Sequence, residues 1–242
     1  PNAGLKWISD THIPTLLDMF DAVIITASPL TDQTYLDTLE FQGCQVFRRK
    51  RNIIVESYLQ AIKHGLNTGA DTILYCDFDR IMHWVRTYPK ELSCIAKHIN
   101  KTGYLIGERG PREYQTHHDA LYYTEQLPNA IISAHLGEKK QHDYLSGCYG
   151  FSSEAATFII KHVKTKDFSL FGEWASIMKQ HGFKPTYLVC KGLEWETPDQ
   201  HRDEVKHCGS IEAYHAWKSS PEEWKRRAQM AYEFVKTIIP KP

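Results

Sequence analysis

The chain has 242 residues, a length that suits one α/β domain with a helical appendage. Apolar residues make up 42% of it and charged residues 24%, which is ordinary for a globular protein with a buried core and excludes a disordered chain. Basic and acidic residues both number 29, so no overall field would draw the chain to nucleic acid or to a membrane surface. We therefore expect no nucleic-acid partner.

Three further features of the sequence bear on where in the cell the protein is found. No apolar run approaches the ~18–20 residues that span a bilayer, and the first residues lack the apolar segment of a signal peptide. The six cysteines include no CxxC pair, and most lie in apolar runs, so we expect reduced, buried thiols. These features predict a cytoplasmic protein without an integral membrane segment.

The first half alternates short β-type runs with helical patterns. The run AVIITAS is apolar and β-branched and ends at Pro29, which is typical of a buried strand. In chain order we predict a strand at 22–28, a helix at 31–41, a strand at 44–48, a helix at 53–67, a strand at 72–76, a helix at 89–101 and a strand at 103–109. This alternation favours βαβ units with parallel strands.

The second half is less regular. Residues 111–146 are polar and rich in histidine and tyrosine, and we expect helix and loop there. The later elements are a strand within 143–153, a helix from about 153 to 163, a helix at about 172–181, a strand at 184–190, and a C-terminal helix that starts at Pro221 behind the N-cap Ser220. The predicted fold class is α/β, with a mostly parallel central sheet and a C-terminal helical extension.

Two acids, Asp77 and Asp79, follow the predicted strand TILYC directly. In an extended chain, residues two apart point to the same side, so both carboxylates would converge at the carboxyl end of a buried strand. Open α/β sheets bind their ligands at this end. Carboxylate oxygens suit Mg²⁺ or Mn²⁺ held together with substrate phosphates, so the pair predicts a metal site. The alternative is a pair of solvated acids in a turn.

The run from AVIITASP through RRKRNIIVESYLQAIKHGLNTGADTILYCDFD resembles the GT-A glycosyltransferases, in which a similar series of strands and helices leads into an Asp-x-Asp motif. The most specific part of the resemblance is 48–79. It implies a GT-A-type mixed, mostly parallel sheet flanked by helices. The catalytic domain would span 1–205, with a donor half at about 20–110 and an acceptor half at about 111–205, and a helical extension at 206–242 would pack on it.

The resemblance implies transfer of a sugar from a nucleoside diphosphate sugar to a hydroxyl acceptor, with Mn²⁺ or Mg²⁺ as cofactor. Asp79, assisted by Asp77, would hold the cation that stabilises charge on the departing diphosphate. Asp77 would also lie near the ribose. The other nucleotide-sugar-binding residues that the resemblance implies are Ala27, Ser28, Pro29, Arg51 and Phe78. Arg51 starts a helix, where a guanidinium favours phosphate, but it can equally belong to a solvated basic run.

The acceptor side would include Gly147 and Tyr149, because SGCYGF is similar to the glycine-containing strand before a helix in this family. Trp195 and Glu196 lie in a later loop whose aromatic and acidic side chains suit a sugar site, and Trp195 would stack on a sugar face. Each of these has a structural alternative as an ordinary turn or surface residue.

Two more residues complete the predicted catalytic set. Glu173 lies where many inverting members carry two acids, so it would act as general base. The resemblance also implies a third metal ligand beside Asp77 and Asp79, which would be His201 or, alternatively, Asp199. Retention of the anomeric configuration is favoured over inversion, because the acid pair is incomplete and a late histidine is present. The consecutive His117 and His118 cannot face together on a helix, so we expect them at the surface.

Two other functions stay open. A haloacid dehalogenase-like phosphohydrolase would use Asp77 as its nucleophile, but Arg80 and Ile81 replace the small residue and threonine expected there, and no late paired acids follow. A non-catalytic nucleotide-sugar-binding protein would keep the fold without turnover. The sequence allows a homodimer.

Overall fold

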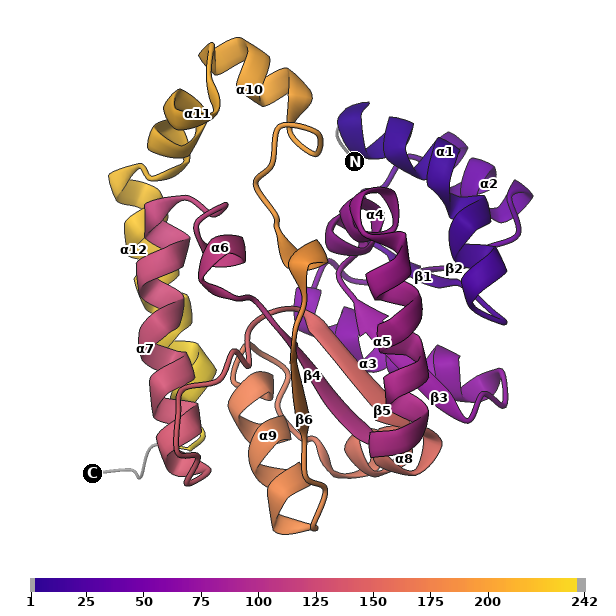
Figure 1. Ribbon diagram of the computed structural model, residues 1–242, viewed down its shortest axis with the longest axis vertical. Coiled ribbons are helices and arrows are strands. Elements are labelled where there is room, and N and C mark those ends of the chain that lie inside the picture. Colours follow the sequence, from indigo (N-terminus) through magenta and orange to yellow (C-terminus); the bar gives the residue numbers. More distant parts are fainter. Residues whose placement is uncertain (1–2, 239–242) are drawn as a thin grey trace.

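A computed structural model describes residues 3–238 (Figure 1). The predicted catalytic domain and helical extension also include 1–2 and 239–242, which lie outside the described residues. The helices are α1 (Ala3–Met19), α2 (Gln33–Phe41), α3 (Ile54–Asn67), α4 (Phe78–Thr87), α5 (Pro89–Thr102), α6 (Pro111–Tyr114), α7 (Asp119–His135), α8 (Ser153–His162), α9 (Leu170–Gln180), α10 (Arg202–Cys208), α11 (Ile211–Lys218) and α12 (Pro221–Val235). The strands are β1 (Ile24–Ala27), β2 (Gln45–Arg48), β3 (Thr72–Cys76), β4 (Tyr104–Glu108), β5 (Cys148–Ser152) and β6 (Thr186–Val189). The class is mixed α/β, as predicted.

The main sheet has the order β3-β5-β4-β6. Strand β5 runs antiparallel to both β3 and β4, and β6 runs parallel to β4. The sheet is therefore mixed, as predicted, with β3, β4 and β6 running in one direction and β5 alone running against them. The reason is local: Cys148 pairs with Cys76 and Ser152 with Thr72, so β5 begins where β3 ends and must run back along it.

Strands β1 and β2 pair in parallel and form a second, two-stranded sheet. A crevice of about 1270 Å³ is lined by residues of both β1 and β3, with α3 and α5 contributing. Its lining includes Thr26 near the end of β1 and Asp77 and Phe78 after β3. The crevice runs along both strands, from Asp21 and Asp71 before their amino ends to Thr26 and Asp77 at their carboxyl ends. Ligands of α/β sheets bind at the carboxyl ends, where Asp77 lies.

The helices cover the main sheet on both faces, which explains the continuous apolar runs of its strands. On one face, Tyr149 and Phe151 of β5 pack against Trp174 of α9, with ring centroids 4.9 and 5.1 Å apart. On the other face, Gly150 lets α5 approach so closely that a Cβ atom there would lie 2.6 Å from Ile99. Strand β5 is therefore buried on both sides.

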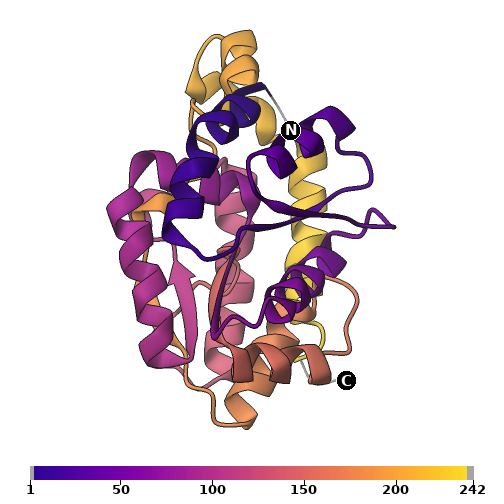
Figure 2. The ribbon, with the colours of Figure 1, turned by 90° about the vertical axis from the view of Figure 1, so that its right-hand side faces the viewer.

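The C-terminal part of the chain packs on the same body. Helix α12 lies along α7 and also contacts α9 (Figures 1 and 2). Ser220 caps α12 by accepting a hydrogen bond from the backbone N–H of Glu223, as predicted for this helix start. Helices α10 and α11 lie together beyond the main sheet, and α10 contacts α1. None of the helices within residues 3–238 combines the length and apolar character needed to cross a bilayer.

Candidate functional site

The predicted acid pair lies at the junction between β3 and α4. Asp77 is the N-cap residue of α4, and Asp79 lies in its first turn. The prediction of an extended chain at Asp77 and Asp79 is wrong, because α4 begins at Phe78. Both acids nevertheless follow the carboxyl end of β3 directly, where the predicted site requires them.

The Asp77 carboxylate makes no capping bond to its helix. Its Oδ1 accepts a hydrogen bond from the Tyr75 hydroxyl at 3.0 Å, and its Oδ2 lies 3.7 Å from Nε of Arg80. Burial raises the pKa of Asp77 to about 6; the Arg80 charge opposes this shift and the Asp79 charge adds to it. Asp77 and Asp79 therefore repel each other, and a cation beside them would relieve that repulsion.

Gly147 lies directly against Asp77. Its carbonyl oxygen accepts a hydrogen bond from the backbone N–H of Asp77 at 3.0 Å, and its φ is +71°, a conformation that favours glycine. A Cβ atom at this position would lie 2.3 Å from Oδ2 of Asp77. Only glycine therefore fits here, and the predicted Gly147 does lie in the site.

Trp195 also belongs to the site, but its observed contact differs from the predicted one. Its indole Nε1 donates a hydrogen bond to Oδ2 of Asp79, while Oδ1 of Asp79 accepts one from the backbone N–H of Arg80. The guanidinium carbon of Arg80 lies over the Trp195 ring, 5.1 Å from its centroid. The indole thus covers Asp79 and one side of Arg80.

His83 fixes the loop that carries Trp195. Its Nε2 lies 2.9 Å from Glu194 Oε2 and its Nδ1 lies 2.9 Å from Asp199 Oδ2, so one imidazole joins both ends of the loop 194–199 to α4. Burial alone would lower the pKa of His83, but hydrogen bonds and charges from Asp199 and Glu194 raise it. Asp79 and His83 are four residues apart on α4 and share one helical face.

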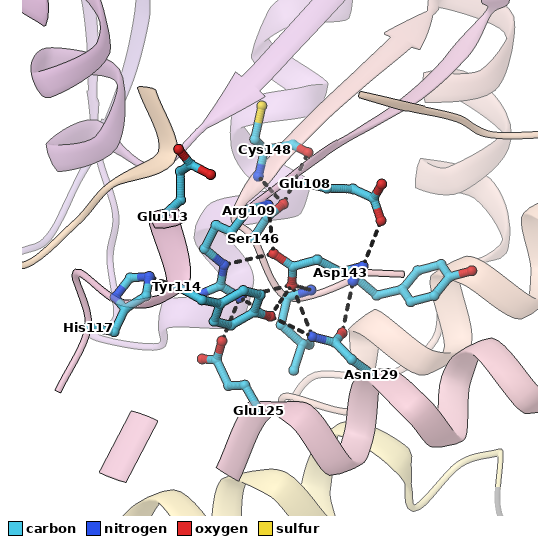
Figure 3. A network of polar contacts seen from close by, with 12 residues as sticks. Glu108, Arg109, Glu113, Tyr114, His117, Glu125, Asn129, Asp143, Ser146 and Cys148 are labelled. Atoms are coloured by element: carbon cyan, nitrogen blue, oxygen red, sulfur yellow. Dashed lines mark hydrogen bonds and ion pairs between the residues drawn. The ribbon is translucent and has the colours of Figure 1, made fainter. Parts of the chain in front are cut away.

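A buried polar network supports the segment before Gly147 (Figure 3). The Arg109 side chain is fully buried, with Nε 2.7 Å from Asp143 Oδ2 and Nη2 2.6 Å from Glu125 Oε2. Burial alone would raise the pKa of Asp143, but the charge and hydrogen bonds of Arg109 hold it below its usual range. Tyr114 and Asn129 also bond to Asp143.

The same network reaches the turn at Gly147. Asp143 Oδ1 accepts from the backbone N–H of Leu145 at 3.2 Å, and Ser146 Oγ accepts from that of Cys148 at 3.2 Å. The Asp143 carboxylate therefore fixes the path of the chain that places Gly147 beside Asp77. Arg109 acts on the site through this segment.

Two predicted residues lie away from the acid pair. Both oxygens of Glu173 accept hydrogen bonds from the loop after α8, at the backbone N–H groups of Lys164 and Thr165. Phe171, two residues earlier on α9, packs against Tyr58, so Glu173 faces elsewhere. Tyr149 is 3% exposed and its hydroxyl donates to the carbonyl of Tyr144, so it belongs to the core. The structure therefore shows structural contacts for both residues, and their predicted catalytic and acceptor-binding roles stay predictions.

The predicted nucleotide-binding residues are divided. Phe78 lines the crevice together with Asp77. Ala27, Ser28 and Pro29 follow at the end of β1 but are not among the residues that line it, and Ser28 Oγ donates to Asn52 Oδ1 at 3.2 Å. Arg51 is exposed and paired with Glu56, which matches the alternative of a solvated basic residue.

The remaining predicted residues, Glu196 and His201, are both sheltered. Burial raises the pKa of Glu196 to about 7, and its Oε2 accepts from the backbone N–H of His118 at 2.6 Å. The His201 ring stacks on Tyr214 with 5.3 Å between centroids. Within residues 3–238 no three His, Cys, Asp or Glu side chains are placed to share a metal ion, and the metal-binding roles of Asp77, Asp79 and His201 stay predictions.

Sequence reasoning missed several residues around the acid pair. Arg80 and His83 are buried, although both lie in a polar stretch that carried no helix prediction. His117 and His118 are 3% and 1% exposed, so the expectation of a surface position is wrong. If a helix had been predicted at 78–87, the four-residue spacing of Asp79 and His83 would have indicated that both side chains lie on one helical face.

Comparison of the chain with protein-family models, with curated proteins and with solved structures finds no significant match in any of the three.

The first prediction concerns Gly147. The Gly147→Ala variant should unfold more easily, because alanine at positive φ costs about 1–2 kcal/mol and moving Asp77 aside loses a further ~0.5–1.5 kcal/mol with its Tyr75 hydrogen bond. Gly182→Ala is the control, since Gly182 has φ +83° and open space around its Cβ position. Urea unfolding would measure both variants. If Gly147→Ala and Gly182→Ala lose the same free energy of unfolding, the contact between Gly147 and Asp77 does not stabilise the fold.

The second prediction concerns Arg109. The Arg109→Gln variant leaves the buried Asp143 without its cation and leaves Glu125 only its longer contact with Arg227, so it should lose roughly 3–5 kcal/mol of unfolding free energy. Arg109→Lys keeps the charge but not the forked geometry, so it should lose less. Arg226→Gln removes an exposed pair with Glu223 and should change stability by less than about 1 kcal/mol. If Arg109→Gln costs no more than Arg226→Gln, the network does not support the fold.

The third prediction concerns pH. Because the folded pKa of His83 is raised above 6.5, its stabilisation is fully present below about pH 6.5 and is lost as pH rises through the folded pKa. His83→Gln should therefore cost about 1–3 kcal/mol at pH 5.5, and less at pH 9. Chemical unfolding of both proteins between these values would measure the difference. A difference that stays constant or grows with pH would contradict the charged state of His83.

Proposed function

We propose that this protein is a metal-dependent glycosyltransferase that moves a sugar from a nucleoside diphosphate sugar to a hydroxyl acceptor. The observation that carries the proposal is the pair Asp77 and Asp79 at the carboxyl end of β3, with Asp77 on the wall of a crevice of about 1270 Å³. Gly147 has no side chain, and the Asp77 carboxylate occupies the space that a side chain there would fill. Fold position, acid pair and open space together fit a diphosphate-binding site.

The two carboxylates fit a divalent cation of the Mg²⁺ or Mn²⁺ kind. Mg²⁺ is usually held by one or two carboxylates plus substrate phosphates, so a set of two protein ligands is sufficient. The raised pKa of Asp77 arises from burial and from repulsion by Asp79, and a cation would remove the second cause. A bound cation would supply electrostatic stabilisation of the diphosphate leaving group.

The chain's own residues divide the remaining tasks. Tyr75 donates to Asp77 and orients its carboxylate, while Trp195 donates to Asp79. The crevice beside Phe78 offers room for the donor nucleotide. Because Glu173 is bonded to the loop at 164–165, it is not available as a general base in this geometry, which supports retention over inversion in the proposed reaction.

The fourth prediction tests the metal site. Nucleoside diphosphates should raise the melting temperature of the wild type only with Mn²⁺ or Mg²⁺ present, because ligand binding to the folded state stabilises it. Asp79→Asn should abolish this shift and weaken metal-dependent binding at least about tenfold, a loss of ~1.4 kcal/mol. Asparagine can still accept the Trp195 hydrogen bond, so the fold should persist.

The matched control is Asp203→Asn, which changes an exposed acid in the first turn of α10. It should behave as the wild type. Metal-independent binding by Asp79→Asn at wild-type affinity would overturn the proposal. Binding without sugar transfer or donor hydrolysis would instead indicate a nucleotide-sugar-binding protein, and phosphate release from monoesters would indicate a phosphohydrolase.

A further inference from the structure

Arg80 is a buried cation whose donors are not all satisfied. The residue is 4% exposed, and its Nε and Nη1 atoms are buried without a hydrogen-bond partner in the part of the chain that the structure describes. The nearest acid contact is Asp77 Oδ2, at 3.7 Å from Nε, which is too long for a hydrogen bond. Burying a charged group without its hydrogen bonds is costly, so such an arrangement calls for an explanation.

The surroundings of Arg80 are suited to an anion. It lies in the first turn of the ten-residue helix α4, where unpaired backbone N–H groups and the helix dipole favour negative charge. Trp195 covers the face of the guanidinium, and stacking of this kind uses the face and leaves the N–H groups at the edge for an acceptor. The planar fork of N–H donors matches two oxygens of a phosphate.

Asp77 connects Arg80 to the crevice. Its side chain is 29% exposed and lines the crevice, whereas Arg80 is buried and does not line it, with its Nε 3.7 Å from Oδ2 of Asp77. A ligand that reaches Oδ2 of Asp77 therefore comes within a few ångström of Nε of Arg80. A ligand bound at Asp77 can therefore contact Arg80 without a residue from another segment.

Charge balance indicates which ligand this is. Asp77 and Asp79 together neutralise a divalent cation, so the acid pair and its metal have no net charge to offer a diphosphate. The Arg80 guanidinium is then the uncompensated positive charge beside the pair. Arg227, which also lies over the Trp195 ring, is already paired with Glu223 and Glu125.

We propose that Arg80 binds the diphosphate of the donor, and this inference rests on the function proposed above. Arg80 contributes the charge and the paired N–H donors, and the acid pair contributes the metal. In the structure the guanidinium lies over the Trp195 ring and 3.7 Å from the Asp77 carboxylate.

The fifth prediction tests this role with inorganic pyrophosphate, measured by calorimetry with and without Mg²⁺. Arg80→Gln should weaken Mg²⁺-dependent binding at least tenfold, and Arg80→Lys should lie between Arg80→Gln and the wild type, because an ammonium keeps the charge without the fork. Arg226→Gln, at an exposed arginine, should bind as the wild type. The melting temperature of Arg80→Gln without ligand should not fall below that of the wild type, because an incompletely bonded buried cation has been removed.

The outcomes separate this inference from the proposed function. If Arg80→Gln binds pyrophosphate as the wild type does while Asp79→Asn has lost binding, the role of Arg80 is overturned and the metal site stands. If binding needs Arg80 but neither Mg²⁺ nor Asp79, the role of Arg80 holds and the metal-dependent function falls. If the wild type binds no diphosphate with or without Mg²⁺, both are overturned. An Arg80→Gln protein that melts well below the wild type and binds unchanged would assign Arg80 a purely structural role.

Discussion

The candidate site depends on the contact between the backbone of Gly147 and Asp77. The Asp77 N–H donates to the Gly147 carbonyl, and the missing side chain of Gly147 leaves the space that the Asp77 carboxylate occupies. This contact joins the end of β3 to the start of β5 and sets the antiparallel direction of that pair. The same contact therefore determines both the sheet topology and the position of the acid.

Support for this contact comes from two sides of the molecule. Arg109, fully buried among carboxylates, fixes the segment from Asp143 to Gly147. His83 fixes the loop with Trp195 against α4. Both supports are ionic and buried, so each stabilises the site only while its partners remain charged and together. The acid pair is thus supported on two sides by buried ion pairs, those of Arg109 and those of His83, which come from segments far apart in the sequence.

Local patterns predicted most of the elements. The strand 72–76 has the predicted bounds, and the helix that starts at Pro221 has the predicted cap. Helix α4 was missed because its buried face carries Arg80 and His83, which read as polar surface in a sequence. The strand directions and the placement of Glu173 and Tyr149 depend on long-range packing, which no local pattern contains. Asp79 and Trp195 are 116 residues apart, and their contact could be found only in the structure.

The placement of Asp79 and His83 on one face of α4 has a mechanical consequence. They lie about one helical turn apart, and each bonds to the same loop, Asp79 to Trp195 and His83 to Glu194 and Asp199. All three bonds join the same face of α4 to the loop 194–199. A movement of Trp195 away from Asp79 would therefore also strain the bonds of His83 to Glu194 and Asp199.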